Sequence, residues 1–229
     1  MAPEMPNRKA LSADEYAMRI RQKIDALRAR TKNCAYFNSE NVHGEIHLYF
    51  TNRAIQLGEA SFRISDLEIP LFVLARVLCE DCIRIAWASQ SDKNAAEFKK
   101  FSVSEMAKVL RVNLVGGRAR LRNKSSGEDV TKTFLPDLDG FITNKKSIEQ
   151  MAKDVGLRKL YDVFYRFGSM VPHATTFGLA PEESDVTPIL AALSAINGFL
   201  GVIILILDGR PPTAREILET LGISKIGGT

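Results

Sequence analysis

Apolar residues recur at helical spacing along most of the chain, beginning with residues 12–32. This stretch opens with "SADE", in which Ser12 and Glu15 have the spacing of a capping box, a reciprocal hydrogen-bonding pattern at helix N-termini. Ile20 and Ile24 follow four residues apart on one face, and most of the charged residues lie on other faces. The pattern predicts an amphipathic helix that ends near residue 32.

Similar periodicity predicts helices through the rest of the chain, separated by glycines and loop residues. The expected helices cover residues 39–63, 69–89, 91–115, 147–156, 157 onward, 187–208 and 210–222. The sequence contains no repeat and no pair of strand-like segments. We therefore expect an all-α protein that forms a single helical bundle over residues 1–229. Residues 1–10 are expected to be a disordered tail, and residues around 116–146 a short loop-rich insertion.

The most apolar stretch, residues 189–207, is long enough to cross a lipid bilayer. It carries no belt of Trp or Tyr, and the adjacent basic residue, Arg210, lies only on its downstream side. A helix that is apolar on every face is also what the centre of a helical bundle requires. We therefore expect a buried core helix and no membrane insertion.

The composition is that of an ordinary soluble protein, with 45% apolar residues, 25% charged residues and a net charge of +4. The sequence contains three cysteines, a small and odd number, which argues against a secreted disulfide scaffold. Cys79 and Cys82 lie within an apolar helical pattern, so we expect two buried residues rather than a zinc or redox pair. The polar N-terminus lacks the apolar core of a signal peptide, which favours a cytoplasmic protein.

Four charged residues interrupt the apolar helix expected over residues 69–89, and three of them share one side. Arg76, Glu80 and Arg84 follow one another at four-residue intervals, so they form one stripe. A carboxylate on a helix this apolar is costly unless it is paired, and we expect Glu80 to pair with an arginine, either Arg76, Arg84 or Arg166. The stripe is either the solvated edge of the helix or a polar wall that faces a later segment.

That later segment is "YDVFYRFGSMVPHATTFG", residues 161–178. Arg166 and His173 are seven residues apart, close to two helical turns, with Ser169 between them on nearly the same side. Pro172 removes a backbone donor and favours a kink directly before the histidine, which would expose the imidazole. The segment is therefore a candidate site, and the alternative is a histidine packed in a helix end.

The spacing Arg166-x6-His173 resembles the R-x(4–6)-H motif of HEPN proteins, all-α domains that include metal-independent ribonucleases of toxin and phage-defence systems. More closely, "RVLCEDCIRIAW" followed by "YRFGSMVPH" is similar to a family of uncharacterised bacterial helical proteins. HEPN nucleases often place a polar residue directly after the arginine, and this chain has Phe167 there. Non-catalytic HEPN-like domains are also known.

The resemblance implies a function in which RNA is bound or cleaved by acid–base chemistry without a metal or another cofactor. An RNA 2′-hydroxyl would attack the adjacent phosphate, with His173 transferring the proton and Arg166 holding the phosphate oxygens. It implies a homodimer, since a second copy supplies the second proton-transfer group. The candidate catalytic residues are Arg166, His173, Ser169 and Glu80. The candidate substrate-binding residues are Arg76, Arg84 and Tyr165.

Two alternatives belong to other functional classes. One is a non-catalytic helical module that binds a partner or a small ligand. The other is a metal-dependent hydrolase: "HGEIH" places His43 and His47 four residues apart, as metal ligands on a helix often are, with His173 as a third ligand.

A basic stretch near the expected insertion contains no intervening acid and is either a solvated loop or a mobile arm that contacts phosphates. It consists of Lys108, Arg111, Arg118, Arg120, Arg122 and Lys124.

Overall fold

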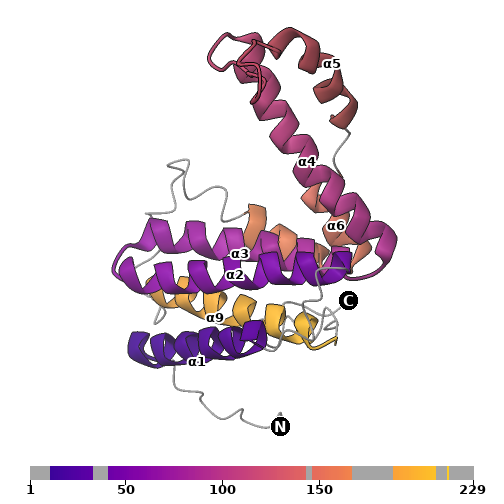
Figure 1. Ribbon diagram of the computed structural model, residues 1–229. Helices are drawn as coiled ribbons and strands as arrows, with labels where there is room; N and C mark the ends of the chain where they lie inside the picture. The colour runs from indigo at the N-terminus through magenta and orange to yellow at the C-terminus, as the bar shows by residue number, and fades with distance from the viewer. Residues whose placement is uncertain (1–10, 33–40, 143–145, 167–187, 210–215, 217–229) are drawn as a thin grey trace, which may run out of the picture. The chain divides into compact units, whose positions relative to one another are not determined.

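The computed structural model describes residues 11–32, 41–142, 146–166, 188–209 and 216. Helices account for nearly all of these residues (Figure 1), and an isolated antiparallel bridge joins Arg122 to Asp129. This confirms the all-α prediction for the described part of the chain. The helix expected over residues 210–222 and the tail expected at residues 1–10 lie outside the described residues, apart from Glu216.

The chain divides into two compact units. Unit 1 consists of Met1–Trp87 and Ile148–Thr229, and unit 2 of Ala88–Ser147. Unit 2 contains the residues of the expected insertion together with the helix that precedes them.

Three long helices of unit 1 pack side by side: α1 (Ala13–Lys32), α2 (Val42–Arg63) and α9 (Pro188–Leu207). The predicted capping box begins α1, since Ser12 N donates to Glu15 Oε2 at 2.7 Å and Glu15 N donates to Ser12 Oγ at 3.2 Å. The side chain of Asn41 caps α2 by accepting from His43 N at 2.9 Å. Side-chain acceptors therefore satisfy backbone donors at both N-termini.

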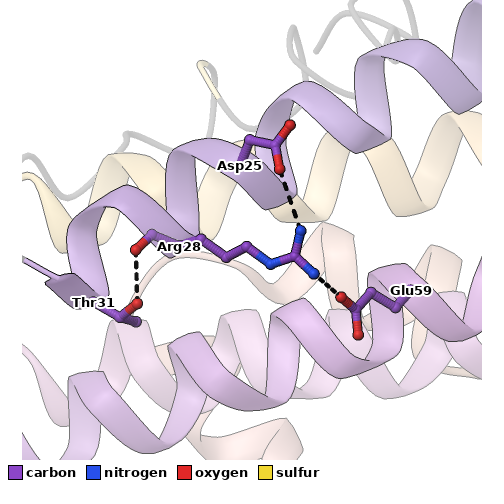
Figure 2. A network of polar contacts seen from close by, with 4 residues as sticks. All are labelled: Asp25, Arg28, Thr31 and Glu59. Carbon is purple, nitrogen blue, oxygen red and sulfur yellow. Dashed lines mark hydrogen bonds and ion pairs between the residues drawn. The ribbon is translucent and has the colours of Figure 1, made fainter.

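An ion-pair network on the surface also joins α1 to α2 (Figure 2). The guanidinium of Arg28 on α1 pairs with Asp25 at 3.3 Å on its own helix and with Glu59 on α2. Thr31 donates its hydroxyl proton to the carbonyl oxygen of Arg28 at 2.8 Å. These side chains are half-exposed, so the network contributes little beside the apolar contacts beneath it.

The apolar helix α9 buries one face in unit 1, including Ile196, Phe199 and Ile203, none of which is exposed. Its less buried side carries Asn197, whose Oδ1 accepts a hydrogen bond from Lys23 Nζ of α1 at 2.6 Å. Among the described residues, α9 is the one helix long and apolar enough to cross a membrane, and 61% of its most apolar window is buried. A core helix passes the same test of length and composition, so the absence of membrane insertion stays a prediction.

Helix α3 (Glu68–Ala88) supplies much of the core of unit 1. Its fully buried side chains include Leu71, Leu78 and Ile83. Cys79 and Cys82 are buried free thiols, and Cys82 Sγ lies 3.4 Å from the carbonyl oxygen of Phe199 on α9. Both residues are thus buried, as expected, and burial raises the pKa of both thiols.

Unit 2 is built on α4 (Asp92–Val115), which begins at the N-cap Ser91 and ends at two glycines. Gly117 has φ 67°, a left-handed conformation that glycine adopts without strain. The chain then returns through a short hairpin to α5 (Thr131–Phe141), which packs on α4. A small apolar cluster holds the two helices together: Ala107, Leu114 and Leu138 are buried, with Leu110, Ala119, Leu121, Leu135 and Ile142 packed around them.

Helix α5 lies where the sequence predicted a loop. Pro136 cannot donate a helical hydrogen bond and Gly140 has low helix propensity, so local preference argues against a helix here. Leu135 and Leu138, three residues apart, instead face the cluster on α4. Packing of this face outweighs the local preference.

Candidate functional site

The chain re-enters unit 1 through α6 (Ile148–Asp154), whose side chains Met151 and Ala152 are buried in the core. Gly156, with φ 71°, ends this helix, and the single turn α7 (Arg158–Leu160) follows. The chain then continues as η2 (Tyr161–Arg166), a π-helical segment. Such wider turns are rare and often occur at functional sites. The helix predicted from residue 157 therefore exists, but its geometry is irregular where the candidate motif begins.

Two tyrosines of η2 stack on each other and connect to α3. The rings of Tyr161 and Tyr165 lie 4.9 Å apart with an interplanar angle of 19°. The guanidinium carbon of Arg76 lies 4.7 Å from the centre of the Tyr165 ring, within the range of a cation–π contact. The segment that carries the candidate motif therefore begins in contact with the charged stripe of α3.

A second arginine lies against the same pair of rings. The guanidinium carbon of Arg158 is 5.5 Å from the Tyr161 ring centre. Its Nε donates to Asp162 Oδ2 at 2.9 Å, and its Nη1 contacts Glu149 of α6. Arg158, Tyr161, Tyr165 and Arg76 thus form a continuous series of contacts, the cation–aromatic stack, from α7 to α3.

The other members of the stripe form the ion pair that the sequence predicts, since Glu80 pairs with Arg84 one turn along α3. Both side chains are only about a fifth exposed. Arg76 is also partly buried, and its Nε is buried with no hydrogen-bond partner in the described part of the chain. This stripe is therefore a half-buried polar surface rather than a solvated edge, in agreement with the interpretation as a polar wall.

A neighbouring acidic residue of α3 is more deeply buried. Asp81 is 1% exposed, and its Oδ2 accepts a hydrogen bond from Arg53 Nε of α2 at 2.6 Å. Burial raises the pKa of Asp81 to about 6, although the nearby Arg53 guanidinium opposes that rise. Trp87 Nε1 donates to Asp154 Oδ2 at 3.1 Å, which attaches the end of α3 to α6. Long-range contacts of these kinds fix α3 against its neighbours.

Only part of the candidate motif can be placed. Arg166 is the last residue of η2, while Ser169, Pro172 and His173 lie outside the described residues. The spacing of Arg166 and His173 along one helix face is therefore untested, and so are their catalytic roles. The structure does bring Tyr165 to Arg76, which joins two of the predicted substrate-binding residues.

Arg158 and Tyr161 are not among the site residues predicted from the sequence. Their spacing carries a signal, because Arg158, Tyr161 and Tyr165 follow one another at intervals of three and four residues, as neighbours on one helix face do.

One comparison with known proteins agrees with the resemblance to an uncharacterised family. The sequence profile of DUF5677, a family of unknown function, matches residues 44–182, which is more than half of the chain. The chain belongs to DUF5677. Comparisons with curated proteins and with solved structures gave no significant match.

The DUF5677 match contains both parts of the candidate site. It includes all of α3 and η2, and it also extends over Ser169 and His173. It ends before α9 begins. Family membership thus confirms the resemblance to an uncharacterised family and leaves its function open.

The histidine pair of this DUF5677 chain lies on α2, away from the site residues in sequence. The ring centres of His43 and His47 are 6.3 Å apart. Burial and the neighbouring His43 lower the pKa of His47, which favours the neutral form that binds metals. Within the described ranges there is no group of three or more metal-ligating side chains, and the proposed third ligand, His173, lies outside them.

Proposed function

We propose that this DUF5677 protein binds RNA with a HEPN-like helical unit and cleaves it without a metal ion. The observation that carries the proposal is the contact between Arg76 of α3 and Tyr165 of η2. It connects the charged stripe to the segment that continues into Arg166 and His173. The π-helical geometry of η2 at the same place is a second supporting feature.

The proposed chemistry is transfer of a phosphoryl group within the RNA strand. The 2′-hydroxyl attacks the adjacent phosphorus, the bond to the 5′-oxygen of the next nucleotide breaks, and a 2′,3′-cyclic phosphate forms. His173 transfers a proton near neutral pH, and Arg166 stabilises the negative charge that develops on the phosphate. One histidine cannot serve conveniently as both acid and base. A homodimer would supply a second histidine from the other copy of the chain.

The remaining candidates act as binding and positioning groups in this proposal. Arg76 and Arg84 attract the phosphates, and Glu80 positions Arg84 through their ion pair. Tyr165 aligns η2 with α3, and Ser169 contributes a hydroxyl group to the reaction. A cytoplasmic location is consistent with an RNA substrate.

The test uses the full-length protein, a labelled single-stranded RNA and EDTA in the buffer. We expect cleavage products with 2′,3′-cyclic phosphate and 5′-hydroxyl ends. His173→Ala should lower the rate by about 10²–10⁴-fold because the proton-transfer group is lost. Arg166→Ala should also abolish cleavage. His43→Ala is the matched control and should retain activity, with far-UV circular dichroism confirming that all three variants fold.

Other outcomes would contradict this function. Loss of activity in EDTA, together with loss in His43→Ala, would favour the metal-dependent hydrolase. Binding of RNA without cleavage would favour the non-catalytic module. The cation–aromatic stack is compatible with that second possibility, because it gives Arg76 and Tyr165 a structural role in holding η2 against α3.

A further inference from the structure

The structure divides the basic stretch of unit 2 into paired and unpaired cations. Lys108 Nζ lies 3.1 Å from Glu105 Oε1, and Arg111 Nε lies 2.5 Å from Asp139 Oδ1. The four cations that follow are exposed, and none has a carboxylate of the described residues within ion-pair distance. They are Arg118, Arg120, Arg122 and Lys124.

These unpaired cations lie on an ordered hairpin rather than on a flexible arm. Val130 N donates to the carbonyl oxygen of Leu121, and Asn123 N donates to that of Glu128, both at 2.9 Å. These two hydrogen bonds pair the hairpin arms on either side of the bridge between Arg122 and Asp129.

The tip of the hairpin is closed by a side chain and a glycine. The side-chain oxygen of Asn123 accepts from Ser125 N at 2.8 Å and from Ser126 N at 3.2 Å. Gly127 adopts φ 74°, in the left-handed region. Because the loop is already ordered, less conformational entropy is lost when it binds a partner.

The exposed and packed residues of the first hairpin arm alternate. Ala119 and Leu121 pack against the apolar cluster of unit 2, whereas Arg118, Arg120 and Arg122 between and beside them are exposed. In extended backbone, alternate residues share one side and lie about 6.5–7 Å apart. That spacing is close to the distance between successive phosphates of an extended single strand.

The two acidic residues of the hairpin offset only part of this row of cations. Hydrogen bonds from Thr131, and then the charges of Arg120 and Arg122, lower the pKa of Asp129. The carboxylate of Asp129 accepts a hydrogen bond from Thr131 N at 2.9 Å, at the start of α5. Glu128 Oε2 accepts from Ser126 Oγ at 3.3 Å. Two acids against four cations leave the hairpin with a net charge of +2.

We propose that Arg118, Arg120, Arg122 and Lys124, here called the basic hairpin, bind the phosphate backbone of single-stranded RNA. The inference rests on the RNA substrate proposed above and assigns its second contact surface. Cations that contact phosphates bind backbone charge irrespective of sequence. The basic hairpin would hold the strand through its phosphates.

The test measures binding rather than cleavage, with a fluorescently labelled 2′-O-methyl RNA that lacks the attacking hydroxyl. Fluorescence anisotropy of the full-length protein is recorded between about 50 and 200 mM salt. The hairpin variant is Arg118→Gln, Arg120→Gln, Arg122→Gln and Lys124→Gln. Each single-strand contact contributes about 0.7 to the slope of log K against log salt, so four contacts should lower it by about 3. At 100 mM salt the affinity should fall roughly 10²–10³-fold.

A matched control separates the hairpin from net charge. The control variant is Arg19→Gln, Arg63→Gln, Lys93→Gln and Lys100→Gln, which removes four other exposed cations. Both variants lower the formal net charge from +4 to zero. Equal losses in the two variants, or unchanged binding by the hairpin variant, would overturn the inference and leave the proposed function standing.

Two further outcomes distinguish the possible partners. Binding without any cleavage of ordinary RNA would remove the proposed nuclease activity, while the hairpin inference would still be decided by the two variants. If the wild-type protein binds no RNA but binds vesicles of phosphatidylserine and phosphatidylcholine through the same four residues, the surface is a membrane contact and the inference fails.

Discussion

The two units of this protein differ in net charge. Unit 2, Ala88–Ser147, contains 12 Lys and Arg against 7 Asp and Glu, a net charge of +5. The rest of the chain contains 19 basic and 20 acidic residues, a net charge of −1. The mild net charge of the whole protein is therefore the sum of one basic unit and one nearly neutral unit.

The units also differ in how they use apolar residues. Unit 1 buries large side chains such as Trp87, Phe50 and Phe199 almost completely. Unit 2 has a small cluster and leaves several apolar side chains of α4 in solvent, among them Met106 at 72% and Val109 at 64% exposure. This contrast indicates that unit 1 supplies most of the folding free energy. Unit 2 instead exposes many of its apolar side chains to solvent.

The largest expected effect comes from a buried aromatic of unit 1. Phe199 is fully buried, and its ring meets Phe164 of η2 edge-to-face at 5.2 Å. Phe199→Ala should lower the free energy of unfolding by about 3–5 kcal/mol, through lost burial and the cavity it leaves. Val109→Ala in unit 2 should change it by no more than about 0.5 kcal/mol. Urea unfolding followed by far-UV circular dichroism measures both. Comparable losses would show that the apolar face of α4 is covered in solution.

The next effect tests the buried ion pair of unit 1. The side chain of Asp81 is 2% exposed and that of its partner Arg53 is 38% exposed. Arg53→Met leaves a carboxylate buried without its partner, and should cost about 3 kcal/mol at neutral pH. Asp81→Asn should cost less, because Arg53 can reach solvent. In unit 2, Arg111→Met breaks a pair that is about half exposed on both sides, and should cost no more than about 1 kcal/mol.

The pH dependence of the same variants provides an independent test. The folded protein raises the pKa of Asp81 from 3.8 to about 6, so it holds this proton more tightly than the unfolded chain does. The resulting stabilisation is fully present below about pH 4 and is lost as the pH rises through 6. The cost of Arg53→Met should therefore shrink between neutral pH and pH 5. Asp81→Asn should remove this pH dependence, and Arg111→Met should leave it unchanged.

The positions of most helices follow from local signals that the sequence displays. The capping box at Ser12 and Glu15, the N-cap at Ser91 and the turn at Gly117 all lie at helix ends in the structure. These features depend on residues within one turn of each other, so they can be predicted from the sequence. The pairing of Glu80 with Arg84 was predictable for the same reason.

The features that could not be predicted depend on contacts between distant parts of the chain. Arg53 and Asp81 are 28 residues apart, and no spacing rule relates them. Helix α5 forms despite Pro136 because its apolar face packs on α4. The π-helical geometry of η2 has no local signature of this kind. The candidate site combines local signals with long-range contacts. The stripe on α3 follows from the spacing of its residues, whereas its contact with Tyr165 depends on the packing of η2 against α3.

The smallest expected effect concerns two helical glycines, and it should have opposite signs in the two units. From sequence, Gly58 is a weak point of α2. In the structure, a Cβ atom at Gly58 would lie 2.9 Å from Ile24 Cδ1 of α1 and 3.4 Å from Leu200 Cδ1 of α9. A Cβ atom at Gly140 of α5 would meet nothing within 4 Å.

Alanine favours a helix over glycine by up to about 1 kcal/mol at both positions. At Gly140 this gain has no opposing contact, so Gly140→Ala should stabilise unit 2 by about 0.5 kcal/mol near the end of its helix. At Gly58 the colliding Ile24 side chain is buried in the core, so overpacking of about 1–3 kcal/mol should exceed the gain. Adding Ile24→Val, which removes the colliding methyl group, should restore part of the loss in a double-mutant cycle. The measurement is the urea unfolding midpoint of Gly140→Ala, Gly58→Ala, Ile24→Val and the double variant. Stabilisation by Gly58→Ala would show that α1, α2 and α9 pack less closely than described.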